Sequence, residues 1–437
     1  MVLRHAAAFG GTGMDNAWVL GIDAAGVVHV GSNSCGDGFP TTPLAYAPAR
    51  RPAAGTDVND ACDVAIARFT ESPAGFSLAY GSYLGGSGAD FVAGLAVTGG
   101  GADWVVGGTS SGDFPTVPGA PQAANRGGFD AFVTRLSASG RALGSSTYFG
   151  GSGYDYPFDV ALDASGNPHV AGRTESSDFP VTAGSFQQAN AGSSDAFVAQ
   201  LTRVGDVAWS TLLGGTGFDW PFAIAVGGSG AVYVAGLTRS ADFPTLLAAQ
   251  NGPGGADDAF VARLSRNGSA LRWSTLLGGP GAEQAHGLAL DGAGGVWVAG
   301  TSAGGLTTSA DATQPSFGGG GNDAFLVRLD EAASVRLRPS ALRFPRTRVG
   351  RSTAPRQVVV TNTGQVPVDV LGVSVGGADP GDFVLTNGCP ATLAPGAACS
   401  VDVRFTPAAA GPRAALLQVG TSASAAPSTV ALSGTGF

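Results

Sequence analysis

Carboxylate side chains recur next to glycine pairs in this chain, and their spacing raises cation or sugar binding as one hypothesis. The string GGxGxD ends at Asp15, Asp90, Asp155 and Asp219. Loops of the type Asp-Phe-Pro supply a second set of carboxylates, at Asp113, Asp178 and Asp242. Carboxylate oxygens are ligands for hard cations such as calcium, and exposed aromatic rings stack on sugars. On this hypothesis the two sets form a rim that binds a cation or a carbohydrate.

A structural role for the same residues is the alternative, and the pattern favours it. An Asp beside Gly stabilises a turn through its side chain, and a Phe-Pro pair can pack between neighbouring elements. GGxGxD also resembles the calcium-binding nonapeptide of parallel β-helices, but that motif stacks about every nine residues. Here it returns only after 64 residues or more. We therefore expect no cofactor, and calcium is kept as a hypothesis.

No arrangement typical of an enzyme is found along the chain. None of the four histidines has a Ser, a Cys or a carboxylate pair at the spacing of a triad or a metal site; they are His5, His29, His169 and His286. The sequence also lacks GxSxG, HExxH and phosphate-binding loops. We therefore predict no catalytic residue, although loops that are far apart in the sequence can assemble a site.

The carboxylates are positioned by a unit that occurs five times. Each unit opens with a glycine pair, at Gly10-Gly11, Gly85-Gly86, Gly150-Gly151, Gly214-Gly215 and Gly278-Gly279. In the fourth unit we expect strands A to D at residues 222–226, 231–236, 258–264 and 271–277. Four antiparallel strands that repeat at this period are typical of a β-propeller blade.

The ends of the repeated region predict a closed ring. Val2–Gly10 has the pattern of a strand D, whereas the fifth unit stops after its strand C at Ala324–Leu329. If the first strand completes the last blade, no sheet edge stays open at the seam. We therefore predict a five-bladed β-propeller over residues 1–333, with four antiparallel strands per blade.

The remaining residues, 334–437, lack the repeat and predict a second domain. Seven or eight short strands follow one another, with Gly, Pro and Asn in the turns between them. This pattern is typical of a β-sandwich.

The four cysteines predict two local disulfides. Cys35 and Cys62 flank a long connection in the first unit, where two buried free thiols are the alternative. Cys389 and Cys399 bracket a turn in the second domain. Local disulfides favour an extracytoplasmic compartment. The N-terminus has no segment of signal-peptide type, so we expect the leader peptide to be missing from this sequence.

Amino-acid composition and charge argue against nucleic acid and membrane as partners of the chain. Asp far outnumbers Glu, which suits a turn-rich all-β protein. The net charge of −9, with the acidic excess in residues 1–333, disfavours nucleic acid. No run of about 18 apolar residues is present, so we expect no membrane span.

Two stretches resemble known bacterial families. The string FGGSGYD…DVALDASGNPHVAG…SSDFPVT…DAFVAQL resembles the SBBP β-propeller repeats over about residues 1–330. The fifth unit departs from it at Pro280, Glu283 and Gly304-Gly305-Leu306. The stretch from LRFPRTRVG to VALSGTGF resembles the immunoglobulin-like repeats of the choice-of-anchor D and ASPM-SPD-2-Hydin group. The resemblance implies an immunoglobulin-like sandwich in a secreted or cell-surface protein, with no assigned activity.

These observations favour a non-enzymatic extracytoplasmic protein that acts in binding, adhesion or as a cell-surface scaffold. Its ligand would be a glycan or a protein at the loop face of the propeller. A secreted enzyme that acts on polysaccharide through the acidic rim is the alternative, and a purely structural surface protein is a third hypothesis.

Overall fold

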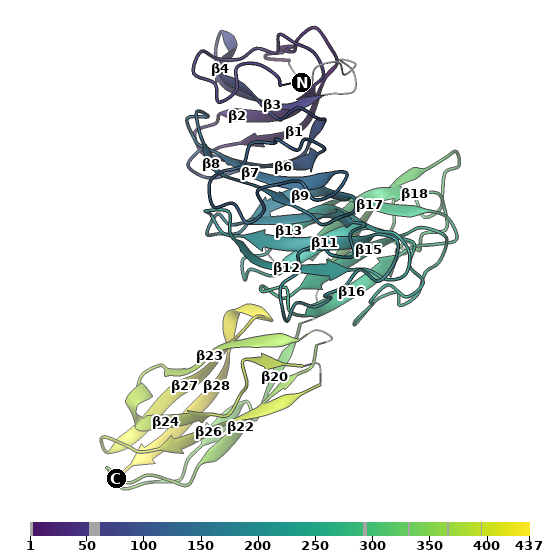
Figure 1. Ribbon diagram of the computed structural model, residues 1–437. Helices are drawn as coiled ribbons and strands as arrows, with labels where there is room; N and C mark the ends of the chain where they lie inside the picture. The colour runs from purple at the N-terminus through teal and green to yellow at the C-terminus, as the bar shows by residue number, and fades with distance from the viewer. Residues whose placement is uncertain (1–2, 52–61, 292–294, 331–332, 365–366, 395) are drawn as a thin grey trace. The chain divides into compact units, whose positions relative to one another are not determined.

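The computed structural model describes residues 3–51, 62–291, 295–330, 333–364, 367–394 and 396–437 (Figure 1). They form an all-β protein of many small sheets, with one short 3₁₀ helix, η1 (Pro380–Asp382). Within these ranges there is no helix of the length and apolar character that a membrane crossing needs. The chain divides into two compact units, Met1–Leu329 and Asp330–Phe437.

The first unit consists of five antiparallel sheets whose strands pair in chain order. The first sheet contains β1 (Asp15–Ile22), β2 (Val28–Ser34), β3 (Asp63–Ser72) and β4 (Gly75–Leu84). The second sheet contains β5 (Asp90–Val97), β6 (Asp103–Thr109), β7 (Asp130–Leu136) and β8 (Leu143–Phe149). The third sheet contains β9 (Asp155–Leu162), β10 (Pro168–Thr174), β11 (Asp195–Leu201) and β12 (Val207–Leu213). The fourth sheet contains β13 (Asp219–Val226), β14 (Val232–Thr238), β15 (Asp258–Leu264) and β16 (Leu271–Leu277). The fifth sheet has three described strands, β17 (Glu283–Leu290), β18 (Gly295–Ser302) and β19 (Asp323–Asp330).

Each sheet packs on the next through its first strand. Contacts join β1 to β5, β5 to β9, β9 to β13 and β13 to β17, and Figure 1 shows the sheets following one another in chain order. Apolar side chains fill the space between neighbours; Val160, Phe179 and Phe197, for example, share one buried cluster with Phe149 of the preceding sheet. A sheet that cannot bury its faces alone is thus stabilised by its neighbours.

A β-bulge interrupts the first strand of every sheet at the same place. On β9, Pro157 pairs with Gly172 and Asp159 pairs with Ala171, so Phe158 has no partner on β10. The register shifts equivalently in the other four sheets. The bulged residues are Trp18, Ala93, Phe158, Phe222 and His286. A bulge redirects a side chain out of the regular alternation of the strand.

The predicted N-terminal strand D is wrong. Val2 lies outside the described residues, and residues 3–14 form no strand. Instead of pairing with the fifth sheet, this segment packs on the first repeat, where the Phe9 ring contacts Phe39 and Phe69. Because β19 is the last described strand of its sheet, the predicted completion of the last blade is not made.

The outer face of the first sheet also shows that the predicted ring is not closed in this structure. Leu20 on β1 is 69% exposed, whereas its equivalent Ile224 in the fourth sheet is 5% exposed. In a closed ring both residues would pack on a preceding sheet. The physical reason is that pairing of the two ends depends on the angles between successive sheets, which no single repeat specifies.

The second unit has two sheets around one core. One sheet has the order β20 (Val335–Arg338), β22 (Arg356–Asn362), β26 (Ala398–Phe405), β24 (Phe383–Asn387). The other has the order β21 (Ala341–Arg343), β28 (Ser424–Gly436), β27 (Gly411–Thr421), β23 (Val368–Gly376), β25 (Thr392–Leu393). Val360 and Val401 of the first sheet share a buried cluster with Leu417 and Val430 of the second.

Candidate ligand-binding pocket

The carboxylates of the GGxGxD strings are directed into the turns that precede the first strand of each sheet. Asp155 is fully buried and accepts hydrogen bonds from the Gly151 N–H and the Ser176 hydroxyl, each at 2.7 Å. The equivalent N–H bond, 2.7–2.8 Å long, goes to Asp15, Asp90, Asp219 and Glu283. These carboxylates thus stabilise the turns, as the structural interpretation expects.

A second carboxylate adds to the reason why the first residue of the second, third and fourth pairs is glycine. A Cβ atom on Gly150 would lie 2.7 Å from Asp155 Oδ2 and 2.9 Å from Asp130 Cγ. The space beside Gly214 is filled in the same way. Burial raises the pKa of Asp130 to about 6 and that of Asp195 to about 6, and a neighbouring Asp adds to each shift. Two carboxyl groups therefore approach each other at these sheet junctions.

The second set of predicted rim residues is exposed but also bonded within the protein. Asp178 accepts hydrogen bonds from the Ser152 N–H at 2.7 Å and the Ser152 hydroxyl at 2.8 Å. The backbone bond lowers the pKa of Asp178. Asp113 and Asp242 make the equivalent contacts. No three His, Cys, Asp or Glu residues gather as metal ligands within the described ranges, and calcium binding stays an untested hypothesis.

The rings of the Asp-Phe-Pro loops lie between the sheets. Phe179 is 5% exposed and stacks on Phe197 with ring centroids 4.7 Å apart. Phe114 and Phe243 pack equivalently on the third strands of their own sheets. These rings are therefore part of the core and cannot stack on a sugar.

The bulged residues form a row of rings that one small side chain interrupts. The Phe158 and Phe222 ring centroids are 5.3 Å apart, and Phe222 lies 5.3 Å from the ring of His286. Trp18 occupies the same position in the first sheet and is 66% exposed. Between Trp18 and Phe158 the second sheet places Ala93. The methyl group of Ala93 leaves a gap where each neighbouring repeat has a ring.

A pocket of about 490 Å³ occupies this gap. Its walls come from the first strands of three successive sheets, from Met14 before β1, and from β2 and the connection that follows it. The lining residues are Met14, Asn16, Trp18, Asn33, Cys35, Cys62, Phe91, Val92, Ala93, Tyr156 and Phe158. Four aromatic rings and no charged side chain are among its described lining residues, so these residues favour an uncharged ligand with an apolar face.

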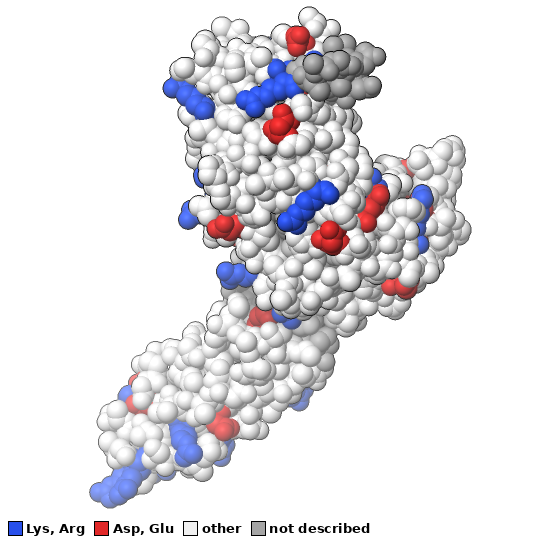
Figure 2. All heavy atoms as spheres, in the orientation of Figure 1, with Lys and Arg blue, Asp and Glu red and all other residues white. Residues whose placement is uncertain are grey.

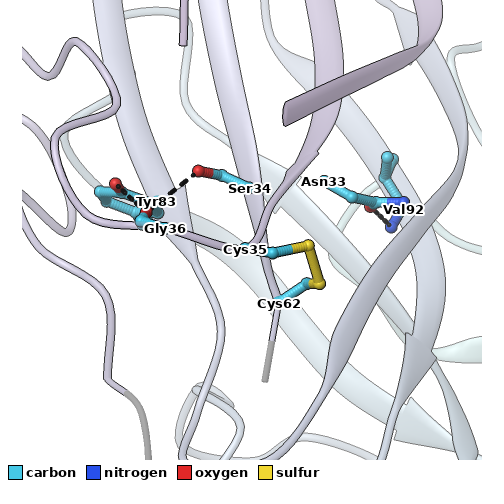
Figure 3. Close-up of a disulfide and its surroundings, with 7 residues drawn as sticks. All are labelled: Asn33, Ser34, Cys35, Gly36, Cys62, Tyr83 and Val92. Carbon is cyan, nitrogen blue, oxygen red and sulfur yellow. Dashed lines mark hydrogen bonds between the residues drawn. A yellow bond between two sulfur atoms is a disulfide. The ribbon is translucent and has the colours of Figure 1, made fainter. Parts of the chain in front are cut away.

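The described polar side chains at the pocket are few. The Asn33 side-chain oxygen accepts a hydrogen bond from the Val92 N–H at 2.8 Å, and Figure 3 shows this pair beside the disulfide. With its oxygen engaged, Asn33 has its NH₂ group to offer as a donor. Burial raises the pKa of Tyr156 to about 12, so its hydroxyl stays protonated. The pocket therefore combines apolar walls with neutral hydrogen-bonding groups.

The disulfide Cys35–Cys62, which the sequence predicted, forms part of this wall (Figure 3). It ties the end of β2 to the start of β3 across a separation of 27 residues. The second predicted disulfide, Cys389–Cys399, is also confirmed. Two disulfides are typical of proteins that fold in an oxidising, extracytoplasmic environment.

Charge is sparse on the surface around the sheets. The face of the molecule in Figure 2 carries isolated Arg and acidic side chains among uncharged residues, without a continuous patch of one sign. One buried ion pair joins Arg68 to Asp103 at 2.7 Å. This pair links β3 of the first sheet to β6 of the second sheet, which is a structural role.

The repeats match a known family in two places. Residues 146–180 and 272–306 match SBBP, described as a beta-propeller repeat. The first match runs from β8 through β9 and β10, so it includes the glycine pair and the bulge. No curated protein matches the chain.

Several solved structures show a weak similarity. A protein of unknown function from Dyadobacter fermentans is 11% identical, with 93% of this chain and 97% of that chain covered and a TM-score of 0.34. A protein of unknown function from Porphyromonas gingivalis is 12% identical, with 47% and 91% covered and a TM-score of 0.21. The ASH/PapD-like domain of human CEP192 is 19% identical, with 25% and 89% covered and a TM-score of 0.18.

Proposed function

We propose that the chain is an extracytoplasmic binding protein whose pocket over Ala93 holds a neutral saccharide. The observation that carries this proposal is the interrupted row of rings. Trp18 and Phe158 flank a gap that a flat ring can fill, and sugars present an apolar face for such stacking. The Asn33 amide and the Tyr156 hydroxyl supply hydrogen bonds for the sugar hydroxyl groups.

The pocket favours binding over hydrolysis. A glycosidase uses two carboxyl groups that flank the scissile bond. The described lining residues include no Asp, Glu or His, and the carboxylates predicted as a rim are bonded to turns. The secreted polysaccharide-acting enzyme therefore finds less support than a non-enzymatic protein in binding or adhesion.

We propose different roles for the two units. We propose that residues 1–333 are a ligand-presenting body of five SBBP-type repeats. Residues 334–437 would be an immunoglobulin-like spacer or docking module of the choice-of-anchor D type. The two sheets around one core and the sequence resemblance support this proposal, and the disulfides support a secreted or cell-surface location.

A saccharide-binding screen tests the proposal. The full chain would be applied to a glycan array, and the affinity for any glycan retained would then be measured with Trp18→Ala and Ala93→Phe. Truncating an aromatic residue that anchors a ligand costs about 2 kcal/mol, or roughly 30-fold in Kd. Ala93→Phe is expected to abolish binding. Phe76→Ala, at an exposed ring outside the pocket, is the matched control. Unchanged binding in both pocket variants would exclude this site.

A further inference from the structure

Among the described strands, the fifth sheet has an edge without a partner strand, and a cavity lies beside it. In the other four sheets a fourth strand pairs with the third, whereas β19 pairs only with β18 among the described strands. Leu306 also stands where the other repeats have the Phe of Asp-Phe-Pro. As a result, Phe325 and Phe317 line a cavity of about 300 Å³ together with Leu306. Leu326 on β19 is 68% exposed.

Residues 3–9 have the sequence pattern of a fourth strand and lie where a fourth strand would lie, but they pair with no described sheet. The turn that follows them is already formed, because the Gly11 N–H donates to Asp15 as Gly151 does to Asp155. The Phe9 ring packs on Phe39 at a centroid distance of 6.0 Å. In the same way, Phe149 at the end of β8 packs on Phe179 of the next repeat, at 5.1 Å. Residues 3–9 thus lie where the fourth strand of a preceding sheet would lie.

The face of the first sheet beside this segment is apolar and exposed. Trp18 is 66% exposed, and Leu20 and Ile22 are 69% and 63% exposed. In the third and fourth sheets the equivalents of Leu20 are Val160 and Ile224, which are buried against the preceding sheet. The first sheet therefore presents one half of an interface that this chain makes four times internally.

We infer that the occupant of both ends is a second copy of this chain, joined head to tail. The β19 edge of one copy pairs with residues 3–9 of the next copy, and the fifth sheet of the first copy packs on β1 of the second. The interface repeats the internal junction between successive sheets and adds a strand to an open edge.

A second copy fits better than closure within one chain. To bring residues 3–9 onto their own β19, the four junctions between sheets would have to change their angles. Three of those junctions, between the first four sheets, contain buried clusters of large side chains, among them Phe132, Phe197 and Phe260. Close-packed cores resist such rearrangement. Association of two copies leaves every junction as it is.

The repeats also give the register of the new strand pair. Ala259 of β15 faces Leu277 of β16, and Val261 faces Thr275. When the strand starts and the glycine pairs are aligned, the equivalent pairs are Ala324 with Phe9 and Leu326 with Ala7. Ala131 faces Phe149 in the second sheet, so the first of these pairs already occurs there with the same two residue types.

Disulfide trapping tests this interface. Full-length Ala7→Cys and Leu326→Cys variants would be mixed under oxidising conditions, with Ala6→Cys as the control because its side chain faces the opposite side of the strand. We expect a linked dimer from the Ala7 and Leu326 variants, at least ten-fold more than with Ala6→Cys. The unmodified chain should associate with rising concentration in light scattering, and removal of residues 3–9 should abolish that association.

Two results would overturn the inference. One is a mixture that yields no linked dimer above the Ala6→Cys control. The other is a chain carrying both Ala7→Cys and Leu326→Cys that links within itself and stays monomeric, because the segment would then close its own ring. The substituted residues lie outside the pocket over Ala93, so neither result bears on saccharide binding.

Discussion

Replacing Ala93 by Phe is expected to fill the pocket and to raise the free energy of unfolding of the first unit. The bulge at this position already holds Phe158 and Phe222 in the next two sheets, so the backbone accepts a ring without strain. The pocket measures about 490 Å³, whereas a cavity of about 150 Å³ is enough for benzene. The added ring therefore has room beside Trp18.

The magnitude follows from burial and ring contact. Fully burying a Phe side chain is worth about 1.5–3 kcal/mol, and the open pocket would bury roughly half of it, about 1 kcal/mol. An edge contact with Phe158 adds about 0.5–1 kcal/mol, as aromatic pairs do. The loss of side-chain entropy offsets part of this sum, and we expect a net gain of about 1 kcal/mol.

Urea unfolding of the full chain, followed by intrinsic fluorescence, measures this gain. The opposite change, Phe158→Ala, removes a ring from the row and is expected to lower the free energy of unfolding. If Ala93→Phe instead destabilised the unit by more than about 1 kcal/mol, a typical cost of overpacking, the equivalence of the five bulges would be refuted.

Three further predictions concern the turns, a disulfide and pH. Asp155→Ala leaves the Gly151 N–H and the Ser176 hydroxyl without their acceptor and should cost about 2–3 kcal/mol in urea unfolding, more than Asp178→Ala at its exposed site. Replacing Cys389 and Cys399, 10 residues apart, by Ala should lower the free energy of unfolding of the second unit by about 2.7 kcal/mol. Burial raises the pKa of Asp90 to about 7, above the ordinary 3.8, so its contribution to stability is full below the ordinary value and is lost as pH rises through 7. Burial lowers the pKa of His169 to about 4, below its ordinary 6.5. Its contribution to stability is therefore full above pH 6.5 and is lost as the pH falls toward 4. Calorimetry should therefore show a stability that falls from pH 6.5 to 8, and less so in Asp90→Asn.

Local sequence patterns predicted the sheets well because the same strand pattern recurs in each repeat. The expected strands at 258–264 and 271–277 coincide with β15 and β16. The turn role of Asp155 was also readable, since Asp beside Gly favours such hydrogen bonds. Closure was not predictable, because it depends on small rotations between sheets that add up over the whole row. The segment ending at Phe9 has the correct pattern but lacks a partner strand.

The pocket was missed for a different reason. The sequence prediction relied on carboxylates, which can bind cations, whereas the pocket exists because the side chain of Ala93 is small. The available signal was Ala93 in a column that otherwise holds Trp18, Phe158, Phe222 and His286. Such a column becomes visible only when the repeats are aligned at their bulges, and a bulge is hard to place from sequence alone.

The bulges separate ligand specificity from strand pairing. A bulged residue has no cross-strand partner, so its size can change while the ladder of hydrogen bonds is kept. One large-to-small exchange at Phe222 would open a second recess, separated from the first by the Phe158 ring, without a new loop. Two recesses on one array would hold a polymer at two of its units, and avidity would then raise affinity without any new type of contact. Repeat proteins of this kind could thus add binding sites one codon at a time.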